Sequence, residues 1–292
     1  MKINIKQIGD MHFNKSFTQE DLDNLRKTIC DNTDYIIFVG DIIDSTNVIK
    51  DEKLRNTLIM WFKKISQDIP VIIEIGNHDI AKSYDNRKSW SFDNNFNFWS
   101  EISKIENVYF LPEQTFYEDK KICVTGINPS FYYYENSDLD KSKDEILYLL
   151  KNNNLLKKTP KNKLNIFVCH SPIHMTDNEI LKYINNFDLI LSGHMHNGLV
   201  FPLIEKVFPK NRGIISPLRR VFPDNARGIK NIKYNDKNIK LVITGGVTKL
   251  AVSHGFLKII NKLYPSVVEE IIYDTNSKKI DINTLKIKKT KN

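Results

Sequence analysis

The fold is predicted from one stretch, Pro70-Val71-Ile72-Ile73-Glu74-Ile75-Gly76-Asn77-His78-Asp79. Its first six residues form a largely β-branched, apolar run that is typical of a buried strand. The Gly76-Asn77 pair that follows indicates a turn, because both residues tolerate positive φ. Taken alone, the stretch is explained by a strand, a turn and an exposed histidine, since short motifs also arise by chance. Polar side chains after the other predicted strands favour a functional explanation.

Strands and helices alternate on the N-terminal side of this stretch. Strands are predicted at residues 1–8 and 35–39, and helices at 18–31 and 51–67. Strand, helix, strand, helix, strand is the pattern of a parallel sheet. In such sheets, ligands collect beyond the carboxyl ends of the strands.

The remaining chain contains further elements of both kinds. A loop is predicted at 81–95, helices at 96–105 and 254–264, strands at 108–111, 115–118, 121–125, 164–169, 187–191 and 241–244, and a hairpin at 267–274 and 279–287. Helix starts are predicted where Ser or Thr precedes an acidic residue by three positions, as in a capping box. This pattern places helix starts at Thr18, Ser142 and Thr176.

The composition is that of a folded protein with an excess of basic residues. The chain has 292 residues, of which 41% are hydrophobic, and this is enough for a core. With no repeat or linker evident, residues 1–292 are expected to form a single domain. The net charge of +8 fits an acidic partner, such as nucleic acid, anionic lipid or a phosphate ester. It fits equally a solvated surface in a chain rich in lysine and asparagine.

The cysteines and the start of the chain bear on its location. Cys30, Cys123 and Cys169 are too few and too widely spaced for a disulfide framework, which favours a reducing compartment. No signal-peptide segment or membrane-spanning run is found. A soluble, cytoplasmic protein is expected, with peripheral contact to a membrane left open.

Seven side chains that can bind metals stand directly after apolar strands. They are Asp10, His12, Asp41, Asn77, His170, His194 and His196. Mixed carboxylate and imidazole shells suit borderline divalent metals such as Mn, Fe, Co, Ni and Zn. Seven donors are too many for one tetrahedral site and suit two metals that share a carboxylate. Such a pair can bind both a nucleophilic hydroxide and the oxygens of a phosphoryl group.

Five motifs together resemble those of the calcineurin-like metallophosphoesterases. They are Asp10-x-His12, Gly40-Asp41-x-x-Asp44, Gly76-Asn77-His78-Asp79, His170 and Gly193-His194-x-His196. The resemblance covers residues 3–196. It implies an α/β fold, namely a four-layer α/β/β/α sandwich around two mixed sheets.

The resemblance also implies a division of the ligands between two divalent transition metals, with Mn, Fe or Zn expected. One metal would be held by Asp10, His12, Asp41 and His196. The other would be held by Asp41, Asn77, His170 and His194, so that Asp41 bridges the two. A hydroxide between the metals would then attack the phosphorus of a phosphomonoester or phosphodiester.

Two further residues acquire catalytic roles from the same resemblance. His78 would be the general acid that protonates the leaving oxygen, and Asp44 would orient it. Asp79 is expected to fix the turn. His174 and His254 match no motif and are expected to be ordinary polar residues.

The resemblance within the family is greatest to the bacterial membrane-associated phosphoesterases. Met195 and Asn197 depart from that subgroup's usual Gly-His-Thr-His-Gly-Gly, and its N-terminal membrane helix has no counterpart. The Asp-Arg-Gly of protein Ser/Thr phosphatases is absent after Gly40, which argues against a phosphoprotein substrate. Residues 197–235 mix apolar and basic side chains and are expected to be an insertion near the active site. They could contact an anionic membrane or a lipid-linked substrate, or they could be core with solvated arginines.

Other functions remain open at this point. A nuclease or cyclic-nucleotide phosphodiesterase suits the basic charge, although no aromatic and basic stacking pattern for single strands is found. Nucleic acid is therefore a possible but less favoured partner. A metal-stabilised scaffold without catalysis would be expected to lack ligands, and none is missing.

Overall fold

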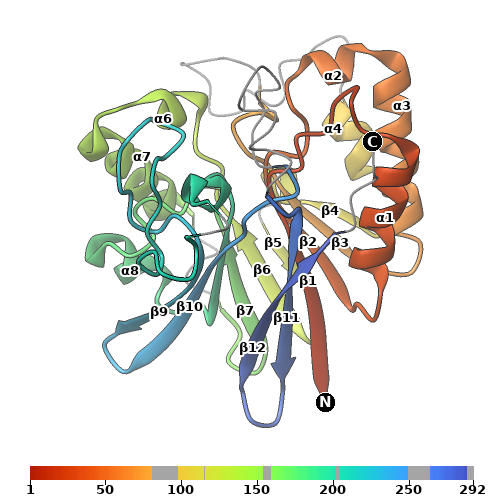
Figure 1. Cartoon of the computed structure of the whole chain (residues 1–292). Helices are drawn as coiled ribbons and strands as arrows, with labels where there is room; N and C mark the ends of the chain where they lie inside the picture. Colours follow the sequence, from red (N-terminus) through yellow and green to blue (C-terminus); the bar gives the residue numbers. More distant parts are fainter. Residues whose placement is uncertain (81–97, 115, 154–158, 202–203, 249–263, 288–292) are drawn as a thin grey trace.

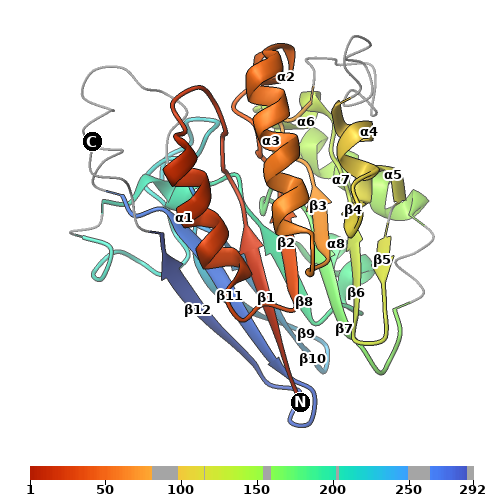
Figure 2. The ribbon, with the colours of Figure 1, turned by 90° about the vertical axis from the view of Figure 1, so that its right-hand side faces the viewer.

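Two mixed six-stranded sheets face one another, and helices cover their outer faces (Figures 1 and 2). This computed structural model describes all residues except 81–97, 115, 154–158, 202–203, 249–263 and 288–292. The arrangement confirms the predicted α/β sandwich.

The first sheet has the strand order β12-β11-β1-β2-β3-β4. Its strands are β1 (Lys2–Ile8), β2 (Tyr35–Val39), β3 (Val71–Glu74), β4 (Val108–Phe110), β11 (Val267–Asp274) and β12 (Ile280–Lys286). Strands β1 to β4 are parallel, as the alternation of strands and helices predicts. The C-terminal hairpin pairs antiparallel with the other side of β1, so that Lys2 lies opposite Asp274.

The second sheet has the order β5-β6-β7-β8-β10-β9. Its strands are β5 (Phe116–Glu118), β6 (Ile122–Gly126), β7 (Leu164–Val168), β8 (Leu189–Ser192), β9 (Gly228–Tyr234) and β10 (Lys237–Ile243). Strands β6, β7, β8 and β10 are parallel, and the two edge strands are antiparallel to them. The carboxyl ends of the parallel strands of both sheets point to the same end of the molecule, which is the upper end in Figure 1.

The helices divide between the two outer faces (Figure 1). The first sheet is covered by α1 (Gln19–Cys30), α2 (Asn47–Lys50), α3 (Glu52–Ile65) and α4 (Phe98–Ser103). The second sheet is covered by α6 (Phe131–Glu135), α7 (Leu139–Asn152) and α8 (Asn178–Ile184). The short helix α5 (Leu111–Gln114) lies where the chain passes from one sheet to the other.

Successive side chains on the central strands serve two different cores. On β2, Ile36 and Phe38 pack against the helices, whereas Tyr35, Ile37 and Val39 face the second sheet. Successive side chains of a strand point to opposite faces. Because both faces of β2 pack in a core, both carry apolar side chains. This explains why the strand is a continuous apolar run in the sequence.

One buried polar side chain joins the two sheets. Gln7 of β1 has no exposed surface. Its amide Nε2 donates to the carbonyl oxygens of Ser192 at 2.9 Å and of Val242 at 3.3 Å. A donor inside an apolar layer needs a partner, and here the partners lie on the opposite sheet. Gln7 thus links the sheets directly below the carboxyl ends of their strands.

Two of the predicted helix starts are displaced: the cap lies four residues earlier than Ser142 and one residue later than Thr176. The capping box of Thr18 and Asp21 is present as predicted. Helix α7, however, begins at Leu139, because the Asp138 carboxylate accepts hydrogen bonds from the first turn. Helix α8 likewise begins after Asp177 rather than at Thr176.

The predicted loop at 81–95 lies outside the described residues, as does the predicted helix at 254–264 apart from Tyr264. The described part of the chain contains no helix with the length and apolarity needed to cross a bilayer.

Candidate metal centre

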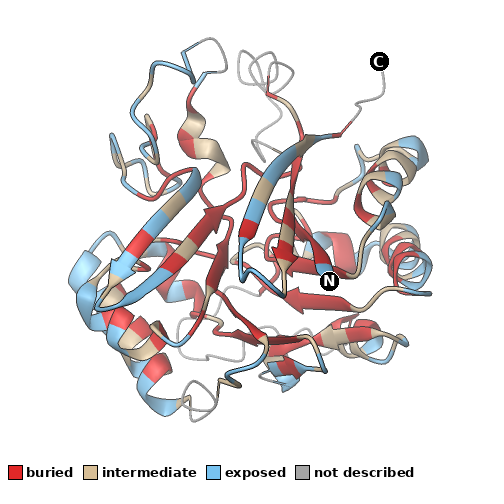
Figure 3. Cartoon of the chain, turned by 90° about the horizontal axis from the view of Figure 1, so that it is seen from below, coloured by how far each residue is buried: buried red, intermediate tan, exposed pale blue. Residues whose placement is uncertain are grey.

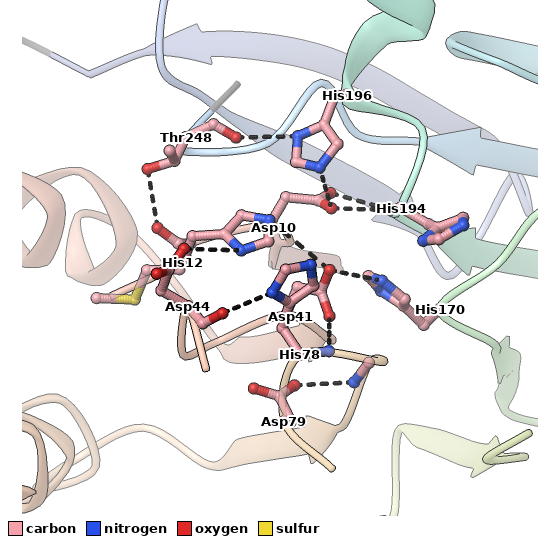
Figure 4. Close-up of polar contacts among 12 residues, drawn as sticks. Asp10, His12, Asp41, Asp44, His78, Asp79, His170, His194, His196 and Thr248 are labelled. Atoms are coloured by element: carbon pink, nitrogen blue, oxygen red, sulfur yellow. Dashed lines mark hydrogen bonds and ion pairs between the residues drawn. The ribbon is translucent and has the colours of Figure 1, made fainter. Parts of the chain in front are cut away.

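Six of the seven predicted ligands meet at the carboxyl ends of the parallel strands (Figure 4), and Asn77 lies in the turn after β3. Asp10 and His12 follow β1, Asp41 follows β2, Asn77 follows β3, His170 follows β7, and His194 and His196 follow β8. Five of the seven are buried, with at most 4% of their surface exposed: Asp10, His12, Asp41, His170 and His194. The structure therefore brings together residues that are widely separated in the sequence.

The backbone is left-handed at five of these seven residues. The φ angles are 50° at Asp10, 46° at His12, 54° at Asp41, 69° at His194 and 46° at His196. A left-handed residue other than glycine costs roughly 1–2 kcal/mol, although Asp and His adopt this conformation more often than most. Such backbone strain clusters at functional sites, where the surrounding structure maintains it.

The loops after β1 and β2 hold each other in this conformation. Asp10 N donates to Gly40 O at 3.0 Å, and His12 N donates to Asp41 O at 2.9 Å. Gly40 itself has a φ of 100°, and a Cβ there would lie 2.5 Å from His170 Nδ1. Any other residue at this position would displace His170, because no side chain fits that space.

Asp10, His12 and His196 form a first group, whose ligand atoms all lie within 4.8 Å of one another. His196 Nε2 is 3.6 Å from Asp10 Oδ1, and the rings of His196 and His12 stack with centroids 5.1 Å apart. His196 Nδ1 donates to Thr248 O at 3.1 Å. That bond leaves Nε2 as the ring nitrogen that faces the group.

A second group is made by Asp41, His170 and His194, again within 4.8 Å of one another. His170 Nδ1 donates to Val39 O at 2.7 Å, and its Nε2 lies 3.2 Å from Asp41 Oδ2. The same Asp41 oxygen is 3.7 Å from His12 Nε2. Asp41 therefore belongs to the second group and also lies close to His12 of the first.

Several buried atoms of the site have no hydrogen-bond partner. They include both ring nitrogens of His12, Nε2 of His170 and His194, and Oδ1 of Asn77 and Asp44. Buried polar atoms are nearly always paired, so each of these atoms requires an explanation. Imidazole nitrogens and carboxylate and amide oxygens are donors that divalent transition metals accept. The residues of the two groups therefore fit such metals.

The ionisation of these groups also suits metal binding. Burial lowers the pKa of His12 and His194 well below the usual value, which favours their neutral forms. Burial alone would raise the pKa of Asp41, but His170 and the other imidazoles hold it well below its usual value. Burial would also lower the pKa of His170, but the Asp41 carboxylate raises it to about 9. Burial also raises the pKa of Asp10 above its usual value. Metal ligands must be deprotonated, so metal binding acts against the raised pKa values of both Asp10 and His170.

His78 lies beside the two groups and is fixed by two bonds. Its Nδ1 donates to Asp44 O at 2.6 Å, and its backbone N–H donates to Asp41 Oδ1 at 2.9 Å. The contact from Asp44 comes from the main-chain carbonyl, while its carboxylate lies 4.0 Å from His12 Nδ1. His78, Asn77 and Asp44 line a pocket of about 350 Å³ that Phe131 and Tyr134 also border.

Asp79 joins the loops that carry the candidate ligands. Its Oδ1 accepts from Ile42 N and Ile43 N, both at 2.9 Å, and its Oδ2 accepts from Gly76 N at 2.8 Å. The expectation that Asp79 fixes a turn is met, and the carboxylate also joins this turn to the loop after β2. Neither Gly76 nor Asn77 adopts positive φ. Gly76 is needed for space instead, because a Cβ would lie 2.3 Å from Asp41 Oδ1.

Two residues at the site carried no signal in the sequence. Thr248 contributes its main-chain carbonyl, which any residue could supply. Tyr134 packs its ring against His170 and His194, with centroids 5.8 Å and 5.1 Å away. His174 lies outside the groups and bonds to Ser142 Oγ at 2.8 Å, whereas His254 is not among the described residues.

The segment 197–235 continues directly from the turn that carries His196. Ile214 N donates to Gly198 O at 2.7 Å, which packs the middle of the segment on that turn. Arg227 is buried, and it bonds to Glu205 Oε1 and to the carbonyls of Arg212, Phe208 and Pro209. This arginine therefore serves the folding of the segment rather than a basic surface.

Comparison with known proteins gives one family match. The family model described as calcineurin-like phosphoesterase matches residues 3–198, which is more than half of the chain. No curated protein sequence matches the chain.

Solved structures give similarities at low sequence identity. GAP50, the anchor in the inner membrane complex of Plasmodium, is 13% identical, with a TM-score of 0.46 over 99% of this chain and 90% of that one. Vacuolar protein sorting 29 from Cryptosporidium parvum is 12% identical, with a TM-score of 0.35 over 99% of both chains.

The role of Asp79 predicts a stability effect. We expect Asp79→Asn to lower the free energy of unfolding by about 1–3 kcal/mol, because the new amide cannot accept from all three backbone N–H groups. Urea denaturation measures this change. Asp68→Asn, the same change at an exposed position, should alter stability by less than about 0.5 kcal/mol. Equal effects of the two substitutions would contradict the assigned role.

Proposed function

The chain belongs to the calcineurin-like phosphoesterase family, and on that basis we propose that it is a metal-dependent hydrolase of phosphomonoesters or phosphodiesters. One observation carries the proposal. Two groups of mostly buried metal-binding side chains meet at the carboxylate of Asp41, which belongs to the second group and lies 3.7 Å from His12 Nε2 of the first. This is the arrangement that a pair of metals sharing a carboxylate requires.

The donor set suggests how the residues divide between two metals. The first would be held by Asp10, His12, Asp41 and His196. The second would be held by Asp41, Asn77, His170 and His194. Bound there, two divalent cations such as Mn, Fe or Zn supply Lewis-acid chemistry, neutralising charge on a phosphoryl group and lowering the pKa of a water molecule.

Main-chain carbonyls orient the imidazole ligands in this proposal. Val39 O holds Nδ1 of His170, and Thr248 O holds Nδ1 of His196. A fixed Nδ1–H leaves the Nε2 lone pair directed at the metal site, and such outer contacts typically change metal affinity or activity 10- to 100-fold.

His78 is the proposed general acid. Its Nδ1 proton is held by Asp44 O, so that Nε2 is the nitrogen available to the leaving oxygen. Burial opposes the charged form, but Asp41 and the Asp44 carbonyl raise the pKa of His78 above its usual value. A protonated imidazole beside the pocket is suited to protonate an alkoxide as it leaves.

A second proposal concerns the substrate, and it rests on exposed side chains of the segment 197–235. Val207, Val221 and Phe222 are 83%, 71% and 61% exposed. Lys206, Lys210 and Arg219 are exposed in the same two turns. Apolar side chains beside basic ones suit the surface of an anionic membrane. We propose that this segment docks on such a surface and presents a lipid-linked phosphate ester to the site.

The hydrolase proposal is tested by turnover together with metal content. Protein purified without chelator is expected to carry transition metal and to hydrolyse p-nitrophenyl phosphate or its bis ester with Mn²⁺. His196→Asn should abolish turnover and reduce bound metal, because asparagine retains a donor near Nδ1 but lacks Nε2. His174→Asn is the matched control, since both histidines have positive φ and only His196 lies in the group. Absence of both metal and turnover would refute the proposal.

The role of His78 is tested by the dependence of rate on the leaving group. His78→Asn should slow esters of alkyl alcohols by about 10²–10⁴-fold, because their leaving oxygen needs a proton. Esters of nitrophenol should be slowed much less. Equal losses for both classes of ester would exclude general-acid catalysis by His78.

The membrane proposal is tested by vesicle flotation. Binding to phosphatidylserine vesicles is expected at low salt, and Val221→Asn combined with Phe222→Asn should weaken it about tenfold, because apolar burial is lost. Met60→Asn combined with Leu139→Asn changes apolar residues that are exposed elsewhere, and should have no effect. Similar binding to phosphatidylcholine alone, or no binding at all, would contradict the proposal.

A further inference from the structure

A large groove lies at the end of the molecule opposite to the candidate metal centre. It has a volume of about 1050 Å³ and lies between the hairpins β9–β10 and β11–β12. Its floor includes Asn165 at the start of β7 and Asp188 just before β8. These are the amino ends of the parallel strands, at the end of the molecule that faces the viewer in Figure 3.

The groove forms where the inner face of the second sheet changes from apolar to polar. On β10, Val242 faces the first sheet and belongs to the core between the sheets. Side chains alternate along a strand, so Lys240 and Asn238 share that inner face. Ile239 and Leu241 point the other way and pack in the core beneath the helices. The part of this inner face that carries Lys240 and Asn238 is polar. It does not pack against the first sheet and instead lines an open groove.

Strand β9 continues the same polar face. Lys233 lies opposite Asn238, and Asn231 lies opposite Lys240. All four side chains line the groove, whereas Ile232 faces the helices. Lysine thus faces asparagine across the two strands, which spreads positive charge along the hairpin without direct lysine–lysine opposition.

The charge of the groove is strongly positive. Seven lysines and two aspartates line it. The lysines are Lys161, Lys163, Lys233, Lys237, Lys240, Lys278 and Lys279. Lys163 pairs with Glu118 and Lys279 with Asp281. Within the described part of the chain, Lys161, Lys233 and Lys240 form no ion pair, and one Asp188 oxygen accepts from Asn165 N.

We propose that this groove binds the phosphate backbone of a nucleic acid strand. Lysine ammonium groups neutralise phosphates as point charges, and binding gains free energy because counterions are released from the nucleic acid. The four asparagines of the lining add donors and acceptors for phosphate and sugar oxygens. Nothing in this proposal depends on hydrolysis at the metal centre.

The lining favours a nucleic acid over a protein or a membrane. Protein interfaces are depleted in lysine and enriched in aromatic residues and arginine, whereas Tyr273 is the only aromatic residue of this lining and arginine is absent from it. A membrane surface would require exposed apolar side chains on a protruding face. Ile280 is the one large aliphatic residue of the lining, and it is buried. A concave, lysine-lined surface instead suits a chain of phosphates.

The test is a titration of a short fluorescein-labelled RNA, and of DNA of the same sequence, by fluorescence anisotropy over a range of salt concentrations. The wild-type chain should bind, with affinity that falls steeply as salt increases. A groove variant combines Lys161→Gln, Lys233→Gln and Lys240→Gln, which removes three lining lysines that form no ion pair with a described residue. It leaves Lys237, which bonds to Asn186 O, and Lys278, which lies over the Tyr273 ring. Its plot of log affinity against log salt should be shallower by about two units, since each phosphate contact contributes about 0.7 for single strands. Its affinity at moderate salt should fall about tenfold or more.

A matched variant controls for total charge. Lys27→Gln, Lys53→Gln and Lys63→Gln remove three exposed lysines from α1 and α3, on the outer face of the first sheet. This variant should bind within about twofold of wild type, because those lysines lie away from the groove. Equal weakening in both variants would overturn the proposal, since binding would then reflect diffuse charge.

A second measurement uses only the wild-type chain. Bound oligonucleotide should slow the acetylation of Lys161, Lys233 and Lys240, measured by mass spectrometry, more than that of Lys27, Lys53 and Lys63. Uniform protection would overturn the proposal. An absence of oligonucleotide binding at low salt would also overturn it. The same holds if the groove variant still binds the oligonucleotide as wild type does but no longer binds polyglutamate or anionic vesicles.

Discussion

The carboxylate of Asp41 is the interaction on which the arrangement of the site depends. One of its oxygens accepts the backbone N–H of His78, and the other lies close to His170 and His12. These contacts join loops from three strands of the first sheet to β7 of the second. Asp41 is buried, so its negative charge is stabilised by the surrounding imidazoles rather than by water. Asp41 therefore contacts two other candidate ligands, His12 and His170, and also the backbone of the proposed general acid His78.

The strain in the backbone has the same origin. Strand β2 ends at Val39, and after Gly40 the backbone is left-handed at Asp41, whose side chain is buried. The loops after β1 and β2 repeat this conformation and bond to each other. The surrounding structure thus stabilises several unfavourable backbone conformations. The candidate ligands are therefore already in position and do not need to move.

Much of the fold could be predicted because its strands are buried on both faces. The continuous run of β2 has no other good explanation, and the capping box at Thr18 identifies α1 correctly. The same Ser/Thr pattern failed at Ser142, which lies inside α7, because Glu145 instead accepts hydrogen bonds from Ser130. A local pattern cannot reveal a partner that is distant in the sequence. For the same reason the charge of Arg227 gave no sign that it would be buried.

The residues of the candidate site could be placed at strand ends, but not their supporting contacts. Those contacts come largely from main-chain carbonyls such as Asp44 O and Thr248 O, and every residue type has one. The two ends of the sandwich also differ in a way that composition could not show. Acidic and imidazole side chains gather at one end, and lysines gather at the other.

The pairing of β1 with β11 determines when the protein can become complete during synthesis. Lys2 of the first strand pairs with Asp274, and the carbonyl of Thr248 holds His196. The first strand and the last candidate ligand both depend on residues that are synthesised later. Contacts of such long sequence separation form late. Until residues 267–274 have been synthesised, β1 lacks one of its two neighbours, and until Thr248 has been synthesised, His196 lacks its anchor. Whatever binds at His196 therefore meets its final geometry only after the chain has been synthesised past Thr248.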